Sequence, residues 1–81
     1  MRVELTRRAA RDLDNLSPRF QNTARKQFEF LANDIRHPSL RAKKYEGIED
    51  VWQGRVNRDY RFFFKIEDDT YLVLAIGPHP K

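Results

Sequence analysis

An aromatic stretch from Val51 to Ile66 constrains the fold of this chain more than any other feature of its sequence. Apolar side chains recur there at every second residue, which is the period of a β-strand with one buried face. The residues Asn57-Arg58-Asp59 interrupt the pattern with a turn, so the stretch predicts an aromatic β-hairpin. Arg55 and Arg61 fall at strand spacing within it, and a sheet surface that carries arginines is suited to holding phosphate.

The remaining residues supply two helices and two further strands. A short strand is expected over Arg2 to Leu5, and Thr6 can cap a first helix. Ser17-Pro18 starts a second helix, which should stop near Arg36-His37-Pro38 because proline disfavours helical geometry in the residue before it. The last three strands are expected at about 51–57, 60–67 and 70–76.

This order of elements predicts an α+β fold of the β-α-α-β-β-β type, in which a two-helix hairpin packs on a small, mainly antiparallel sheet. The 81 residues leave no room for a second core, so residues 1–81 are interpreted as a single domain. A domain of this size is only marginally stable alone and would gain from a stabilising partner.

Alternation along the last three strands also predicts which side chains the helices cover. The covered set is expected to be Trp52, Val56, Tyr60, Phe62, Phe64, Ile66, Leu72, Leu74 and Ile76. The open face is expected to carry the alternate residues, namely Gln53, Arg55, Asn57, Arg61, Phe63, Lys65, Tyr71, Val73 and Ala75. On that face, Phe63 and Tyr71 could stack a nucleic-acid base or equally pack against a protein partner.

Charge and composition narrow the range of partners. Sixteen Lys and Arg against 12 Asp and Glu give a net charge of +4, which suggests an anionic partner such as nucleic acid or an acidic protein segment. The chain has no cysteine, and its two histidines form no metal-spaced cluster. No apolar run approaches the roughly 20 residues that span a bilayer. We therefore expect no metal or other cofactor, no membrane contact and a cytoplasmic location.

Several short segments, taken in order, resemble the RelE/ParE superfamily of bacterial toxins. They are the basic loop that ends in Tyr45-Glu46-Gly47, Trp52 at the start of one strand, Tyr60-Arg61 at the start of the next, and the terminal Gly77-Pro78-His79-Pro80-Lys81. The resemblance covers nearly the whole chain and implies a toxin of a type II toxin-antitoxin system, neutralised by an antitoxin that wraps it. It leaves two activities open, because RelE-like members cleave mRNA in the ribosomal A site whereas ParE-like members inhibit DNA gyrase.

The resemblance assigns roles to individual residues. Arg61 matches the arginine that contacts the scissile phosphate in the nuclease branch, and Arg55 matches a basic position on the preceding strand. His79 falls near the position after the last strand that supplies an arginine or histidine in active relatives. Two departures favour the gyrase branch: Gln53 stands where ribosome-cleaving relatives often carry lysine, and the tyrosine that often follows His79 is missing.

RNA cleavage by attack of the 2′-hydroxyl needs a base, cations around the pentavalent phosphorus and an acid, but no obligatory metal. Arg61 and Arg55 suit the cationic role, with a solvated sheet surface as the alternative. His79 suits the acid or base because its ordinary pKa is near 6.5, and the alternative is a residue of a flexible terminus without a role. Without the tyrosine, proton transfer must fall on His79, Glu46, Lys81 or a residue nearby. The other cations expected to contact ribosomal RNA are Lys43, Lys44, Arg41, Arg58 and Lys81. For Lys43, Lys44 and Arg41 the alternative is a solvated loop, and for Arg58 it is a solvated charge or a contact to the hairpin backbone.

The leading hypothesis is therefore a ribosome-dependent mRNA endonuclease whose catalytic residues are Arg61, His79 and Arg55. Its expected partners are a cognate antitoxin, the ribosome and mRNA. The alternative is a ParE-like protein that binds DNA gyrase and catalyses nothing. A helix-turn-helix DNA binder ranks last, because the apolar stripes of both helices are needed to cover the sheet.

Overall fold

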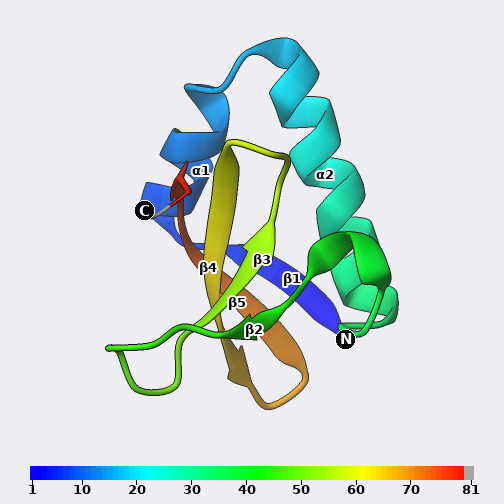
Figure 1. Ribbon diagram of the computed structural model, residues 1–81, viewed down its shortest axis with the longest axis vertical. Helices are drawn as coiled ribbons and strands as arrows, with labels where there is room; N and C mark the ends of the chain where they lie inside the picture. The colour runs from blue at the N-terminus through cyan, green and yellow to red at the C-terminus, as the bar shows by residue number, and fades with distance from the viewer. Residues whose placement is uncertain (80–81) are drawn as a thin grey trace.

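The chain folds in the predicted order, with one short strand and one 3-10 turn added between the second helix and the hairpin (Figure 1). The structure, a computed structural model, describes residues 1–79. Its elements are β1 (Arg2–Leu5), α1 (Arg7–Asp14), α2 (Pro18–Asn33), the 3-10 helix η1 (Pro38–Leu40), β2 (Lys43–Lys44), β3 (Trp52–Arg55), β4 (Tyr60–Glu67) and β5 (Thr70–Pro78).

Both helices begin where the sequence predicts. The Thr6 hydroxyl accepts a hydrogen bond from the backbone N–H of Ala9 at 3.1 Å, and the Ser17 hydroxyl accepts one from Phe20 at 3.3 Å. These side chains satisfy N–H groups that have no partner inside a helix. Helix α2 ends at Asn33, earlier than predicted, because Asp34 turns extended and its carboxylate accepts a hydrogen bond from the backbone N–H of Arg36.

Five strands form one sheet in the order β1-β5-β4-β3-β2. β1 runs parallel to β5 and the other neighbours are antiparallel, which confirms the mainly antiparallel sheet. The unpredicted strand β2 is only two residues long and pairs with Trp52 and Gln53 at the sheet edge. Figure 1 shows the α1–α2 hairpin beside the sheet and the loop between β2 and β3 extending away from the α1–α2 turn.

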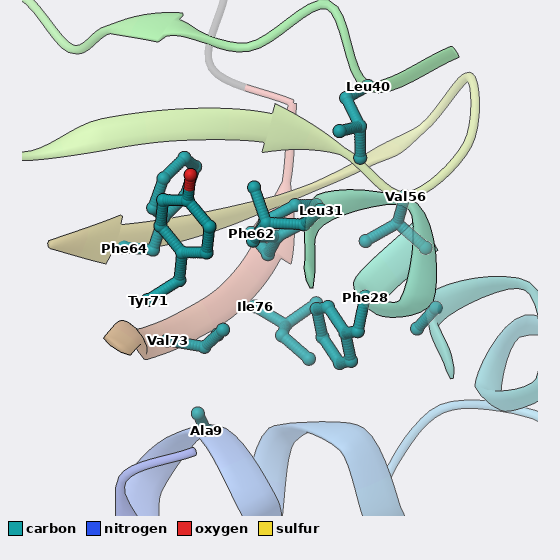
Figure 2. Packing of buried hydrophobic residues seen from close by; sticks show 11 residues of the cluster. Ala9, Phe28, Leu31, Leu40, Val56, Phe62, Phe64, Tyr71, Val73 and Ile76 are labelled. Carbon is teal, nitrogen blue, oxygen red and sulfur yellow. The ribbon is translucent and has the colours of Figure 1, made fainter. Parts of the chain in front are cut away.

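One face of the sheet packs against the helices and holds the core (Figure 2). Phe62 and Phe64 of β4 are completely buried there, as is Leu31 of α2. The ring of Phe28 meets Phe62 edge-on with 5.1 Å between centroids. Gly54 is required beside them, because a Cβ atom at this position would lie 2.3 Å from Cζ of Phe62. We call this side of the sheet the helix-covered face and the other side the open face.

The predicted faces are wrong for much of β5, because a β-bulge shifts its register. Phe63 pairs with Ala75 but Phe64 pairs with Val73, so Leu74 is the extra residue. The bulge inverts the alternation, and Tyr71 and Val73 lie buried on the helix-covered face while Leu72 and Leu74 are only half-buried. Figure 2 shows Tyr71 beside Phe64 in the core, so Tyr71 is not available to stack a base.

The prediction is also wrong for Ile66, which has the parity of the core residues but is 44% exposed. It lies near the end of β4, next to the turn that leads into β5. No helix in residues 1–79 is both long and apolar enough to cross a membrane.

Candidate phosphate-binding site

Arginines from two neighbouring strands oppose each other at one end of the sheet. Arg55, the last residue of β3, pairs directly with Arg61 of β4, and Arg61 pairs in turn with Gly77 of β5. Residues that are directly opposite in a sheet project from the same face, so both arginines lie on the open face, as predicted. Like charges in this relation repel each other, and the strand pairing holds them together.

Arg41 joins this pair from the segment between η1 and β2. The pKa of Arg61 is lowered by partial burial first and then by the positive charges of Arg55 and Arg41, while Asp59 acts weakly in the opposite direction. Within residues 1–79 the only ion pair joins Arg8 and Asp12, so none of the three arginines is matched by a carboxylate there. We call Arg41, Arg55 and Arg61 the arginine row.

The guanidinium of Arg61 is fixed by the hairpin turn that precedes it. Its Nη1 atom donates to the carbonyl oxygens of Asn57 at 2.7 Å and Tyr60 at 2.9 Å, and reaches that of Arg58 at 3.5 Å. Its Nε and Nη2 atoms form no hydrogen bond with any residue in the described range. One edge of the guanidinium therefore anchors the turn and the other can meet an anion.

A buried glutamine holds the backbone of the arginine row in place. Gln27 of α2 is only 6% exposed, and its Nε2 atom donates to the carbonyl oxygens of Arg55 at 2.7 Å and Ser39 at 3.0 Å. Its Oε1 atom accepts a hydrogen bond from the Ser39 hydroxyl at 3.0 Å. Gln27 thus ties the end of β3 to the segment that carries Arg41. The sequence gives no signal for this role, because a glutamine within a predicted helix is expected to be exposed to solvent.

A shallow hollow of about 480 Å³ opens beside the arginine row. Arg41, Arg55 and Arg58 contribute cations to it, and Thr23, Gln27 and Ser39 contribute polar groups. Arg41 and Arg58, which are predicted to contact ribosomal RNA, therefore lie next to Arg55, which is predicted to be catalytic. The remaining lining residues are Pro38, Val56 and Asn57.

His79 lies at the same end of the sheet as the arginine row. Its backbone N–H donates to the carbonyl oxygen of Asp59 at 2.8 Å, and the preceding Pro78 pairs with Tyr60. This places His79 beside the β3–β4 turn that Arg61 anchors. Its side chain is exposed. Lys81, the other predicted terminal residue, lies outside the described residues.

Lys43 and Lys44 are separated from each other by the pleat of β2. Lys43 pairs with Gln53, whereas Lys44 pairs with Trp52 and holds its ammonium 5.9 Å from the centre of the Trp52 ring. Both lysines are exposed, and successive strand residues point to opposite faces. Only Lys43 therefore shares the face of the arginine row. Gln53 is buried to 8% exposure and brings no charge to that face.

The chemistry of this end of the sheet is that of an anion site. Planar guanidinium groups bind phosphate oxygens in pairs and stabilise charge that develops on them, and an imidazole can transfer protons near neutral pH. Among residues 1–79, no three His, Asp or Glu side chains gather as metal ligands.

Comparison with known proteins identifies the family. A family model described as the ParE toxin of the type II toxin-antitoxin system parDE matches residues 3–81. The chain belongs to this family of ParE toxins. It is therefore a toxin of a type II toxin-antitoxin system, within the RelE/ParE superfamily that the sequence resembles. Among curated protein sequences, none matches the chain significantly.

Solved structures show the same fold at low sequence identity. A YoeB/ParE toxin from Agrobacterium tumefaciens aligns over 99% of this chain and 100% of its own, with a TM-score of 0.82 and 13% identity. The RelE–RelB complex from Pyrococcus horikoshii aligns over 95% of this chain and 92% of its own, with a TM-score of 0.78 and 20% identity. The toxin-antitoxin complex RelBE2 from Mycobacterium tuberculosis aligns over 96% of each chain, with a TM-score of 0.78 and 23% identity.

Proposed function

We propose that this toxin is a ribosome-dependent mRNA endonuclease that cleaves without a metal. The arginine row carries the proposal, because the positive charges of Arg41 and Arg55 act on Arg61 at one end of the sheet, and none of the three forms an ion pair with a carboxylate in residues 1–79. Repulsion and partial burial both disfavour this arrangement in the free protein. A bound phosphate would offset the repulsion among the three arginines, and this favours an anion as the ligand.

The proposed reaction is a transesterification at one phosphate of the mRNA. The 2′-hydroxyl attacks the adjacent phosphorus, the P–O5′ bond breaks, and the products are a 2′,3′-cyclic phosphate and a 5′-hydroxyl. Arg55 and the free edge of Arg61 bind the non-bridging oxygens and stabilise the charge of the pentavalent transition state. His79 either accepts the 2′-hydroxyl proton or donates one to the leaving 5′-oxygen.

The proposed partners are a cognate antitoxin, the ribosome and mRNA. The antitoxin is supported by the RelE–RelB and RelBE2 complexes, whose toxins share this fold. Lys43, Arg41 and Arg58 would contact ribosomal RNA through its phosphates. A ribosomal target would place the action of the toxin in the cytoplasm.

Inhibition of DNA gyrase is the second candidate. The observation in its favour is that the matching family model is that of ParE, together with the uncharged and buried Gln53 on β3. In that case the arginine row would bind an acidic surface of the target protein, and His79 would have no proton to transfer.

Primer extension on a defined mRNA in a reconstituted translation reaction, with and without ribosomes, tests the proposal. We expect ribosome-dependent cuts that Arg55→Ala slows by about 100- to 1,000-fold and that His79→Ala slows by about 100- to 10,000-fold. Arg55 is the sharper arginine to change, because Arg61→Ala also removes hydrogen bonds to the turn. Arg25→Ala, on the exposed side of α2, is the matched control.

Intact mRNA in the presence of folded wild-type toxin would contradict the nuclease. The gyrase candidate then predicts loss of supercoiling activity when purified gyrase is mixed with the toxin. Cuts that persist in both Arg55→Ala and His79→Ala would leave the nuclease standing and remove this site from it.

A further inference from the structure

A second hollow lies on the open face, beyond the arginine row. It encloses about 420 Å³ and is lined by Tyr45, Ile48, Val51, Phe63, Lys65, Leu74 and Ala75. Its lining is almost entirely apolar, with the Lys65 side chain as its one cation. The Tyr45 and Phe63 rings meet edge-on in it, with 5.3 Å between centroids. We call it the Phe63 groove.

The groove shares a strand and a face with the arginine row. Phe63 follows Arg61 by two residues on β4, which places their Cα atoms roughly 6.8 Å apart on the same side of the sheet. The residues opposite them on β5 are the small Ala75 and Gly77. A Cβ atom added at Gly77 would meet nothing within 4 Å, so open space runs beside Arg61.

We propose that the Phe63 groove binds a nucleobase of the RNA whose phosphate lies on the arginine row. This inference rests on the proposed nuclease function and adds to it a residue set that senses the base. Stacking on aromatic side chains is a principal way in which proteins bind unpaired bases, and every base has a face that can stack. Lys65 supplies a hydrogen-bond donor for an acceptor on the base edge.

The closeness of Phe63 to Arg61 on one face of β4 favours a nucleotide over a protein side chain. A ligand that fills both the groove and the arginine row must join a flat, weakly polar group to an anion through a short spacer, and a base linked to phosphate by one ribose has that form. The bulge at Leu74 brings two consecutive β5 residues, Leu74 and Ala75, to the groove wall. The side chain of Leu74 would otherwise face the helices.

Binding of 2′-O-methylated RNA trinucleotides tests the proposal without any need for cleavage. One trinucleotide is intact, and each of three others lacks a single base. We expect removal of one particular base to weaken binding to the wild-type toxin by about 5- to 150-fold, and removal of the others to have a smaller effect. In Phe63→Leu, which keeps the site apolar, that difference should shrink, whereas Phe63→Tyr should retain it.

Two further measurements separate this inference from the proposed function. Inorganic phosphate, titrated in the same way, reports the arginine row alone, and its affinity should be the same in wild type and Phe63→Leu. Ile66→Ala lies on the same strand but outside the groove, so it should change neither the affinity for inorganic phosphate nor that for the RNA trinucleotide. If the base-dependent difference is present while mRNA stays intact in translation, the nuclease fails and the base-binding groove stands.

Three outcomes would overturn the groove. Equal affinities for the intact trinucleotide and all three abasic ones would show that no base is held. A base-dependent difference that is the same in wild type and Phe63→Leu would place the base elsewhere. Affinities unchanged by Phe63→Leu for RNA but lowered for the cognate antitoxin would assign the groove to a protein side chain.

Discussion

The two faces of β4 differ in how well their side chains are packed and how well their charges are paired. On the helix-covered face, Phe62 and Phe64 are fully buried among other rings, and every buried side-chain polar atom in residues 1–79 has a hydrogen-bond partner. On the open face, Arg61 stands opposite another arginine, and Phe63 lines an open groove. Most of the buried core therefore lies on one face, while the other keeps arginines that form no ion pair within residues 1–79 and an apolar groove for a ligand.

The neighbouring residues Phe62 and Phe63 test most directly whether the two faces contribute differently to stability. Phe62→Ala removes a fully buried ring and should lower the free energy of unfolding by about 3–5 kcal/mol, measured by urea denaturation. Phe63→Ala, one residue along the strand but half-buried on the open face, should cost clearly less. Equal costs for the two would mean that the open face contributes to stability as much as the core does.

Gly54 and Gly77 provide a second test, because one lies against the core and the other faces open space. Gly54→Ala would drive a methyl group into the Phe62 ring and should destabilise the protein by about 1–3 kcal/mol, because the ring is enclosed and cannot move away. Gly77→Ala meets open space and should change stability by no more than about 0.5 kcal/mol. Thermal and urea unfolding of both variants would check this. A harmless Gly54→Ala would show that the core yields more easily than the contact implies.

Much of the fold follows from local signals in the sequence. Thr6 and Ser17 cap the helices as predicted, and the hairpin of β3 and β4 follows from alternation around the Asn57–Asp59 turn. These signals depend only on neighbours in the chain. The bulge at Leu74 could not be found in this way, because the strand carries apolar residues at both parities and either face fits the pattern.

The candidate site was predicted in part for the same reason. Arg55 and Arg61 occupy the predicted open face because the hairpin register is local. The position of Arg41 near Arg61 depends on how the chain returns from α2 to the sheet edge. The hydrogen bonds of Gln27 join it to residues that lie 12 and 28 positions away in the sequence. Such long-range relations leave no periodic trace in a single sequence.

Gln27 gives a prediction that links the two faces. Gln27→Leu leaves the Arg55 and Ser39 carbonyl oxygens without their donor and should cost about 1–3 kcal/mol of stability. Because the arginine row loses its alignment, we also expect weaker binding of inorganic phosphate. Gln21→Leu is the matched control, since Gln21 donates to the Asp14 and Leu16 carbonyl oxygens in the helix hairpin instead. If both variants weaken phosphate binding equally, Gln27 supports the fold and not the site.

One substitution in the arginine row is expected to stabilise the protein. Arg55→Gln removes one of two opposed positive charges and should raise the free energy of unfolding by about 0.2–1 kcal/mol at low salt. Salt screens the repulsion, so the gain should shrink as ionic strength rises. The lowered pKa of Arg61 has the same meaning, because burial and neighbouring cations disfavour its charged form in the folded protein. Arg25→Gln makes the same change in net charge on α2.

A gain in Arg55→Gln that exceeds the gain in Arg25→Gln, and that comes with weaker phosphate binding, would show that the open face gives up stability for its ligand. Phosphate at a fixed, high concentration should then raise the free energy of unfolding of the wild type more than that of Arg55→Gln. A ligand that binds only the folded state stabilises it more when its dissociation constant is lower, and Arg55→Gln binds phosphate more weakly. If Arg55→Gln is instead less stable than the wild type, the arginine is held by favourable contacts. The difference between the two faces would then be one of packing alone.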